Sequence, residues 1–301
     1  MKLETLQQIK KILNNTQTEV NVEKLNLDGM SGNKLLYTIH SLTELLCSDT
    51  DVYLEVGVFR GLTLLTNSNK NNNIKCFGID NFSLFDENSE NKHFILNKSN
   101  ELNLKNCLLI DADYEDALSN LSSHIGNCKV GVFFIDGAHD YRSQLVSLLQ
   151  IKPFLNENSV IIIDDANYPH VRQATNDFLK SHTEFALLFE AYTKSHPNNM
   201  DINEFEDTAK NGWWNGVNII VNDSNNNLGR VLTSEIGKDL YFITHDIFRN
   251  KYATLSYDII KLAQNSNFDK IEKLMKEYSN NSNLYEHQNT YSDNLTNFNL
   301  L

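Results

Sequence analysis

The sequence predicts a doubly wound α/β fold, in which helices cover both faces of a mostly parallel β-sheet. Hydrophobic residues make up 41% of the 301 residues, which is enough to bury a full core. From about residue 51 onward, short apolar runs alternate with polar, helix-like stretches, a rhythm typical of βαβ units. Two of these runs, residues 130–135 and 160–163, show little alternation of apolar and polar residues, which suits central strands covered on both faces.

The predicted sheet is preceded by residues 1–50, which we expect to form N-terminal helices. Residues 34–47 carry apolar side chains at spacings of three and four, the period of an amphipathic helix. The central region then extends over residues 51–230. Its predicted strands are residues 52–56, 74–79, 106–110, 130–135, 159–163, 185–189 and 217–221.

Two segments depart from this regular pattern. Residues 192–216 form a polar insertion between the last two predicted strands, and a lid is one interpretation of it. Residues 231–301 form a C-terminal extension, in which 238–242 is a candidate strand and 253–278 has a helical pattern. The last residues, 279–301, are rich in Asn, Ser and Tyr and predict an extended or disordered tail.

The formal net charge of −13 argues against a protein that wraps nucleic acid or lies on an anionic membrane, because both tasks favour clustered Lys and Arg. Residues 1–15 lack the apolar stretch and cleavage site of a signal peptide. No segment approaches the ~20 apolar residues of a membrane-spanning helix. The four cysteines are scattered without a CxxC pair, so we expect buried thiols and a cytoplasmic location.

The first predicted strand leads into a glycine turn that carries an acid. Glu55 precedes Gly57, and Gly61 follows four residues after Gly57, so a ligand can approach the backbone closely. A nicotinamide-dependent oxidoreductase would normally show GxGxxG here to seat a pyrophosphate. Phe59 occupies the position of the middle glycine instead, and the acid suits a cationic ligand better than a diphosphate.

Acidic residues also follow the next two predicted strands. The Asp80 carboxylate could accept hydrogen bonds from both hydroxyls of a ribose, and its alternative role is the N-cap of a helix. Asp113 could contact an adenine amino group. Because ligands of doubly wound sheets bind beyond the carboxyl ends of the strands, these acids belong to one candidate site.

The glycine turn, the Asp80 position and the later segments IDGAHDY and IIIDDANY together resemble the class I S-adenosylmethionine-dependent methyltransferases. Within that superfamily they are most similar to the macrocin-type sugar O-methyltransferases of macrolide and aminocoumarin biosynthesis. The resemblance covers roughly residues 51–221. It implies a Rossmann-like, seven-stranded sheet whose final hairpin carries the one antiparallel strand.

The same resemblance implies how the chain binds S-adenosylmethionine. Glu55, Gly57 and Gly61 would line the methionine side of the cofactor, Asp80 its ribose, and Asp113 with Tyr114 the adenine region.

A second acidic group predicts a metal site. Asp136 ends the strand at residues 132–135, and Asp164 with Asp165 ends the strand at 160–163. If these strands are neighbours, about 4.8 Å apart, the three carboxylates converge and repel one another unless a cation joins them. Oxygen ligands favour Mg²⁺ or Mn²⁺ over zinc. The resemblance likewise implies that these three acids hold Mg²⁺; the alternative is that Asp164 caps a helix and Asp165 is solvated.

His139 lies three residues after Asp136, where a neutral imidazole could remove the proton from a hydroxyl. Its alternative role is that of a surface or capping histidine. Some of the resembled enzymes use an aspartate one residue earlier, where this chain has Ala138, and Asp140 could orient His139 or act in its place. Three further candidates for substrate contact have equally good structural explanations: His170, Trp213 and Trp214.

We therefore expect an S-adenosylmethionine-dependent O-methyltransferase that uses Mg²⁺ or Mn²⁺, with Asp136 and His139 as the catalytic residues. The expected acceptor is a hydroxyl of a sugar, a glycan or another small molecule, with catechol-like phenols as the second class. The C-terminal helices could form an oligomer interface. Two other functions stay open at this point: an NAD-dependent oxidoreductase, and a non-catalytic binding protein that retains the fold.

Overall fold

The computed structural model describes residues 1–86, 88–229, 232–233 and 255–286. It divides into two units, residues 1–235 and 236–301. The first unit contains the sheet, and the second contains a pair of helices. The candidate strand at 238–242 lies outside the described residues.

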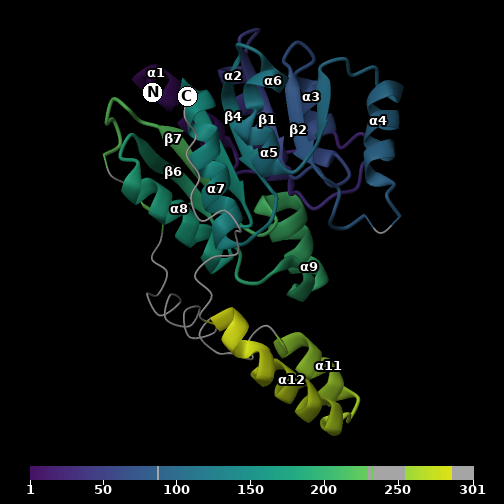
Figure 1. Cartoon of the computed structure of the whole chain (residues 1–301). Coiled ribbons are helices and arrows are strands. Elements are labelled where there is room, and N and C mark those ends of the chain that lie inside the picture. Colours follow the sequence, from purple (N-terminus) through teal and green to yellow (C-terminus); the bar gives the residue numbers. More distant parts are fainter. Residues whose placement is uncertain (87, 230–231, 234–254, 287–301) are drawn as a thin grey trace. The chain divides into compact units, whose positions relative to one another are not determined.

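One seven-stranded sheet organises the first unit, with the strand order β3-β2-β1-β4-β5-β7-β6 (Figure 1). Strand β7 runs antiparallel to both of its neighbours, and the remaining pairs are parallel. The prediction of a Rossmann-like, mostly parallel sheet is therefore confirmed. The strands are β1 (Asp51–Val56), β2 (Cys76–Asp80), β3 (Cys107–Asp111), β4 (Lys129–Ile135), β5 (Leu155–Asp164), β6 (Phe185–Ala191) and β7 (Val217–Asn222).

Helices cover both faces of this sheet and form two separate cores. One face packs against α1 (Leu3–Asn15), α2 (Asn33–Leu46), α3 (Leu62–Lys70) and α4 (Asn91–Glu101). The other packs against α5 (Tyr114–Ser119), α6 (Leu121–Ile125), α7 (Tyr141–Ile151) and α8 (Pro169–Ser181), and the short η1 (Lys152–Phe154) follows α7.

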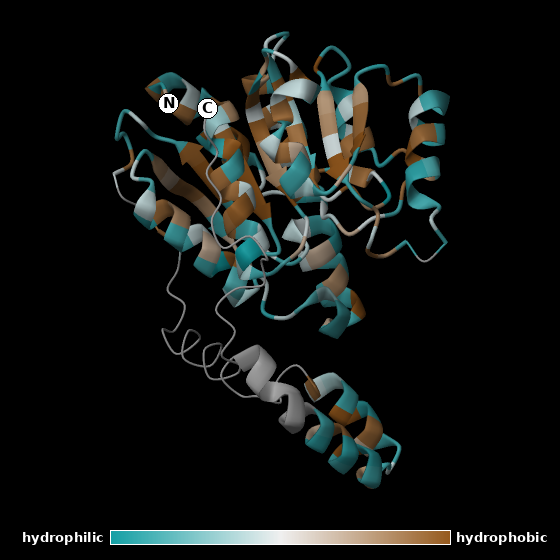
Figure 2. Cartoon of the chain, in the orientation of Figure 1, coloured by the Kyte–Doolittle hydropathy of each residue, from teal (hydrophilic) through white to brown (hydrophobic). Residues whose placement is uncertain are grey.

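Strand β4 shows why the central runs lack polar alternation. Successive side chains of a strand point to opposite faces, so Phe133 enters one core and Phe134 the other. Both side chains are fully buried. Figure 2 shows this as hydrophobic strands between helices whose outer sides are hydrophilic.

The insertion between β6 and β7 is largely helical, with η2 (Pro197–Asn199), α9 (Ile202–Glu204) and the π-helical η3 (Phe205–Trp213). Helix η3 packs on the start of α2. A Cβ added to Gly32 would lie 2.2 Å from the Gly212 carbonyl oxygen, and the Asn33 amide donates to Asn211 Oδ1 over 3.0 Å. The insertion is thus attached to the N-terminal helices.

The second unit contains α11 (Ser256–Gln264) and α12 (Phe268–Glu286). The predicted helical region is present but interrupted at residues 265–267, where Ser266 adopts a left-handed φ of 55°. The prediction of an extended or disordered tail is wrong for residues 279–286, because α12 continues to Glu286. Adding residues to a helix that has already formed costs little free energy, and the ion pair between Lys276 and Glu272 stabilises the preceding turn. No described helix is both long enough and apolar enough to cross a membrane.

Gly57 makes the closest backbone contact at the sheet edge. Its φ is +88°, and an added Cβ would lie 1.9 Å from the carbonyl oxygen of Asp136. The turn after β1 can therefore pass the end of β4 only if residue 57 has no side chain.

We expect Gly57→Ala to lower the free energy of unfolding by at least about 3 kcal/mol, because it adds a backbone collision to left-handed strain. Gly126→Ala is the matched control, since Gly126 also has a positive φ (+65°) but no atom within 4 Å of an added Cβ. It should cost only the strain of its own backbone conformation (φ 65°, ψ −133°), about 1–3 kcal/mol. Urea unfolding measures both, and equal losses would contradict the contact.

Candidate active site

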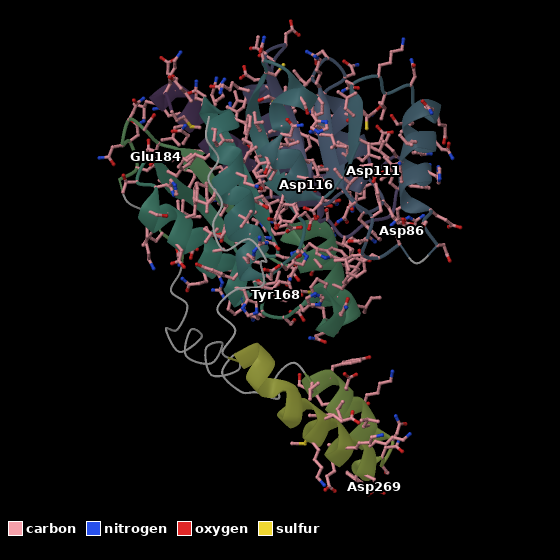
Figure 3. All side chains as sticks on the ribbon, in the orientation of Figure 1. Asp86, Asp111, Asp116, Tyr168, Glu184 and Asp269 are labelled. Atoms are coloured by element: carbon pink, nitrogen blue, oxygen red, sulfur yellow. The ribbon has the colours of Figure 1, made fainter. Side chains whose placement is uncertain are left out.

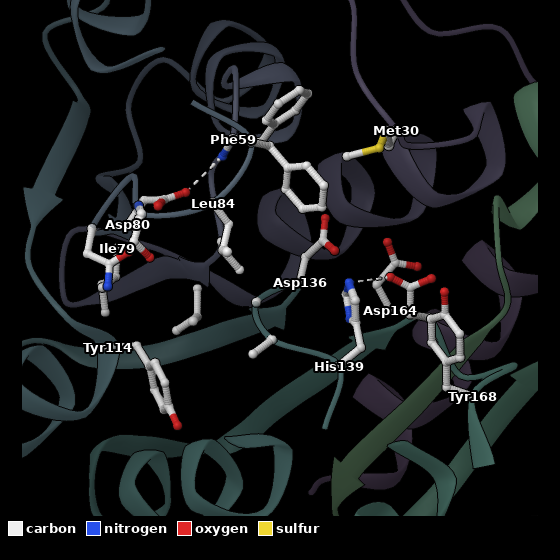
Figure 4. Close-up of a pocket in the computed structure, with 18 of the residues that line it drawn as sticks. Met30, Phe59, Ile79, Asp80, Leu84, Tyr114, Asp136, His139, Asp164 and Tyr168 are labelled. Carbon is white, nitrogen blue, oxygen red and sulfur yellow. Dashed lines mark hydrogen bonds and ion pairs between the residues drawn. The ribbon is translucent and has the colours of Figure 1, made fainter. Parts of the chain in front are cut away.

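The carboxyl ends of the parallel strands meet at one edge of the sheet. Val56 is in register with Ile79 on one side and Ile135 on the other, and Ile135 with Ile163. A cleft of about 570 Å³ lies along this edge (Figure 4). It has two parts: the ends of β1, β2 and β3 border one, and the ends of β4 and β5 with the insertion border the other.

Asp80 holds the glycine turn in place. Its Oδ2 accepts from the backbone N–H groups of Val58 (2.8 Å) and Phe59 (2.9 Å), and its Oδ1 accepts from Phe82 N–H (2.7 Å). The helix N-cap interpretation is wrong, because α4 begins only at Asn91. Oδ1 keeps capacity for one further hydrogen bond, so a ribose hydroxyl remains a suitable donor.

Gly57, Asp113 and Tyr114 also line the cleft. Asp113 caps α5, since its Oδ1 accepts from Glu115 N–H over 2.9 Å. The cap fixes the carboxylate at the mouth of the cleft, with its second oxygen 3.5 Å from the Asn81 amide nitrogen.

Two predicted cofactor residues lie behind the turn, outside the cleft lining. Gly61 has a φ of +80° and starts α3. Glu55 is fully buried and accepts hydrogen bonds from the Tyr53 hydroxyl (2.5 Å) and the Thr63 hydroxyl (3.1 Å). Burial raises the pKa of Glu55 to about 8.

At the other end of the cleft the structure brings Asp136, His139 and Asp165 together. One ligand atom from each lies within 4.8 Å of the others. His139 Nε2 is 2.8 Å from Asp165 Oδ2. Asp165 is 9% exposed, so the solvated alternative is wrong for it.

Asp164 lies beside this group but is not part of it among the described residues. It is 1% exposed, and its Oδ1 has no hydrogen-bond partner in the described part of the chain. It is not the cap of α8, whose N-cap position is Tyr168.

The acidic cluster is unfavourable without a cation. Burial, and then the carboxylates of Asp164 and Asp165, raise the pKa of Asp136 well above its usual range. Burial and Asp165 likewise raise the pKa of Asp164. A hard divalent cation such as Mg²⁺ or Mn²⁺ would relieve this repulsion and satisfy the unpartnered Asp164 oxygen, so the donor set fits such an ion.

Several wall residues could not be identified from the sequence. Tyr168 stacks on the His139 ring with centroids 5.7 Å apart, and His196 lies 6.1 Å from Tyr168. Trp214 and Met30 complete this side. Of these residues, the sequence indicates only Trp214 as a candidate for substrate contact. Nothing in the local sequence indicates that the other side chains meet at this wall.

The remaining candidates are explained structurally. His170 is exposed in the first turn of α8 and does not line the cleft. Trp213 packs on Phe189 with ring centroids 5.1 Å apart.

The raised pKa of Glu55 makes the free energy of unfolding depend on pH. In the cofactor-free protein its pKa of about 8 exceeds the ordinary 4.5, so the folded state loses stability as pH rises between these values. Glu55→Gln removes this loss. We expect its stability relative to wild type to rise by about 1 kcal/mol per pH unit between pH 5 and 8. Urea unfolding at several pH values measures the difference, and parallel profiles would contradict it.

Residues 54–166 match the family model of a methyltransferase domain. No curated protein sequence matches the chain. Similar solved structures include a TDP-rhamnose 3′-O-methyltransferase of calicheamicin biosynthesis, with 18% identity, 62% of this chain and 88% of that chain covered, and a TM-score of 0.44. An O-methyltransferase from Bacillus cereus, in complex with S-adenosylhomocysteine, has 11% identity, coverage of 73% and 91%, and a TM-score of 0.47.

A third similar structure is the O-methyltransferase of tomaymycin synthesis from Streptomyces achromogenes, with 12% identity, coverage of 73% and 90%, and a TM-score of 0.47. These similarities are too low to assign an activity. The family match spans β1 to the turn after β5, the segment that carries the glycine turn and the acidic strand ends. Residues 54–166 of the first unit are therefore similar to a methyltransferase domain.

Proposed function

We propose that the protein methylates a hydroxyl group of a sugar, a glycan or another small molecule, with the help of a divalent cation. The observation that carries this proposal is the His139–Asp165 pair, 2.8 Å apart, beside Asp136 and the unpartnered Asp164 oxygen. This group shares one cleft with Gly57 and Asp80.

S-adenosylmethionine supplies an electrophilic methyl group when bound. Gly57 would leave room for it at the backbone, and Asp80 Oδ1 would accept a hydrogen bond from its ribose. Asp113 and Tyr114 border the adenine side. Glu55 and Gly61 act from behind the turn: Glu55 accepts hydrogen bonds from the Tyr53 and Thr63 hydroxyls, and Gly61 sets the path of the turn into α3.

Asp136, Asp164 and Asp165 would hold the cation. When bound, the cation makes a coordinated hydroxyl more acidic and neutralises part of the cluster. Asp136 follows β4, and the acidic pair ends β5, the neighbouring strand in register with it, which supports this choice of ligands.

His139 is suited to accept the proton. Its Nε2 faces Asp165 Oδ2, so the ring carries its hydrogen on Nε2 and its lone pair on Nδ1. Nδ1 is buried and has no hydrogen-bond partner among the described residues, so it would be the atom that accepts the proton once a bound hydroxyl reaches it. Asp165 then stabilises the imidazolium after transfer, as in other carboxylate–histidine pairs.

The acceptor would bind against the wall formed by Tyr168, His196, Trp214 and Met30. Aromatic faces of this kind pack on sugar rings and on phenols, and the wall excludes water from the reacting hydroxyl. The four free cysteines fit the proposed cytoplasmic location.

Calorimetric titration with S-adenosylhomocysteine is the direct test of the cofactor site. We expect micromolar binding that is lost in Asp80→Ala but kept in Asp111→Ala. Asp111 is the matched control (labelled in Figure 3): it is the register partner of Asp80 on β3, but it is exposed and pairs with Lys92 at 2.5 Å. Chelation of metal should leave this binding intact and abolish methyl transfer. Binding of NADH in place of S-adenosylhomocysteine would refute the proposal.

His139→Gln should lower kcat for methyl transfer by roughly 10²- to 10⁴-fold, because it removes the proton acceptor. The KM for S-adenosylmethionine should stay nearly unchanged. His170→Gln serves as the control, because His170 follows the acidic pair in sequence but is exposed outside the cleft. Steady-state kinetics with a neutral sugar acceptor measures both variants, and a fully active His139→Gln enzyme would exclude His139 as the base.

A further inference from the structure

The insertion at residues 192–216 is attached at both ends to the segment that carries Asp165. Near its start, Asn167 donates to Thr193 Oγ1 over 2.6 Å and accepts from Thr193 N–H over 3.0 Å. At its end, Asn167 N–H donates to the Asn215 carbonyl over 3.1 Å. The insertion and the acidic turn therefore form one hydrogen-bonded unit.

Asp165 needs such support because its backbone is strained. Its φ is 53°, in the left-handed region that residues other than glycine seldom adopt. Its carboxylate is held on both oxygens: Oδ2 faces His139 Nε2 at 2.8 Å, and Oδ1 accepts from the Asn215 side-chain amide. The carboxylate cannot rotate without losing one of these partners.

The side chain of Asn215 lowers the stability of the fold. It is 1% exposed, and its Oδ1 has no hydrogen-bond partner among the described residues. A buried, unsatisfied amide oxygen destabilises a protein. Within the described part of the chain, the one side-chain hydrogen bond of Asn215 goes to a carboxylate of the acidic cluster, which points to a role in the site.

We propose that Asn215 is a positioning residue for the cation site: it fixes Asp165 Oδ1, so that Oδ2 keeps its place beside His139 and Asp136. Cation affinity then depends on the insertion, although the insertion supplies none of the three acids. This role rests on the proposed function, since it presumes that the cluster binds a divalent cation.

The test is titration of the full-length protein with Mn²⁺, with free Mn²⁺ measured by electron paramagnetic resonance. We expect Asn215→Ala to weaken Mn²⁺ binding about 10- to 100-fold, the usual effect of losing a hydrogen bond to a metal ligand. Its S-adenosylhomocysteine affinity should stay nearly unchanged. Asp165→Ala provides the reference for loss of a ligand.

Asn218→Ala is the matched control. Asn218 is also fully buried, and its Oδ1 also has no partner among the described residues. Its amide donates to the Tyr192 hydroxyl over 3.0 Å and to the Val217 carbonyl over 3.2 Å, and none of its described hydrogen bonds reaches the cluster. We expect it to leave Mn²⁺ affinity nearly unchanged. Equal losses in both variants, or wild-type affinity in Asn215→Ala, would overturn the positioning role.

Failure of the proposed cation site and failure of Asn215→Ala to fold give different results. Absence of Mn²⁺ binding in the wild type would refute the cation part of the proposed function and this role with it. If Asn215→Ala does not fold, Asn215→Ser replaces it, because its buried hydroxyl can donate but ends short of Asp165. We expect an affinity between those of the wild type and Asp165→Ala, and wild-type affinity would again overturn the role.

Discussion

The contact between the Gly57 turn and the end of β4 is the constraint on which the site depends. Gly57 N–H donates to the Ile79 carbonyl over 2.9 Å, and Asp136 N–H donates to the Val56 carbonyl over 2.8 Å, so three neighbouring strands are tied together where they end. No side chain fits between residues 57 and 136. This close approach directs the Val58 amide at Asp80 and opens one continuous cleft from β3 to β5.

The acidic end of that cleft lowers the stability of the folded protein, because it gathers like charges and backbone strain. Three carboxylates gather where burial makes ionisation costly, Asp164 keeps an oxygen without a partner among the described residues, and Asp165 has left-handed backbone. Buried charge and backbone strain of this kind are typical of sites that bind a ligand. His139 contacts one oxygen of Asp165, and a bound cation would compensate the negative charge.

The insertion at residues 192–216 forms part of the cleft wall and is attached to the segment that carries Asp165. It packs on α2 through Gly32, it is attached to Asn167, and it supplies His196 and Trp214 to the wall of the cleft. The acceptor side is therefore assembled from segments far apart in the chain, and changes in the insertion would alter both the shape of the wall and the setting of Asp165.

The sequence by itself determined the doubly wound class, the order of the motifs along the chain and the acidic residues of the cleft, because apolar runs and the acids that end them are local patterns. Convergence of Asp136 with Asp165 could be predicted, since adjacent parallel strands end together. Only the tertiary structure decided that Glu55 lies behind the turn, that His139 rather than Asp164 joins the close group, and that Asn215 contacts Asp165. These outcomes depend on side-chain directions and on contacts between segments 50 residues apart, which no local pattern encodes.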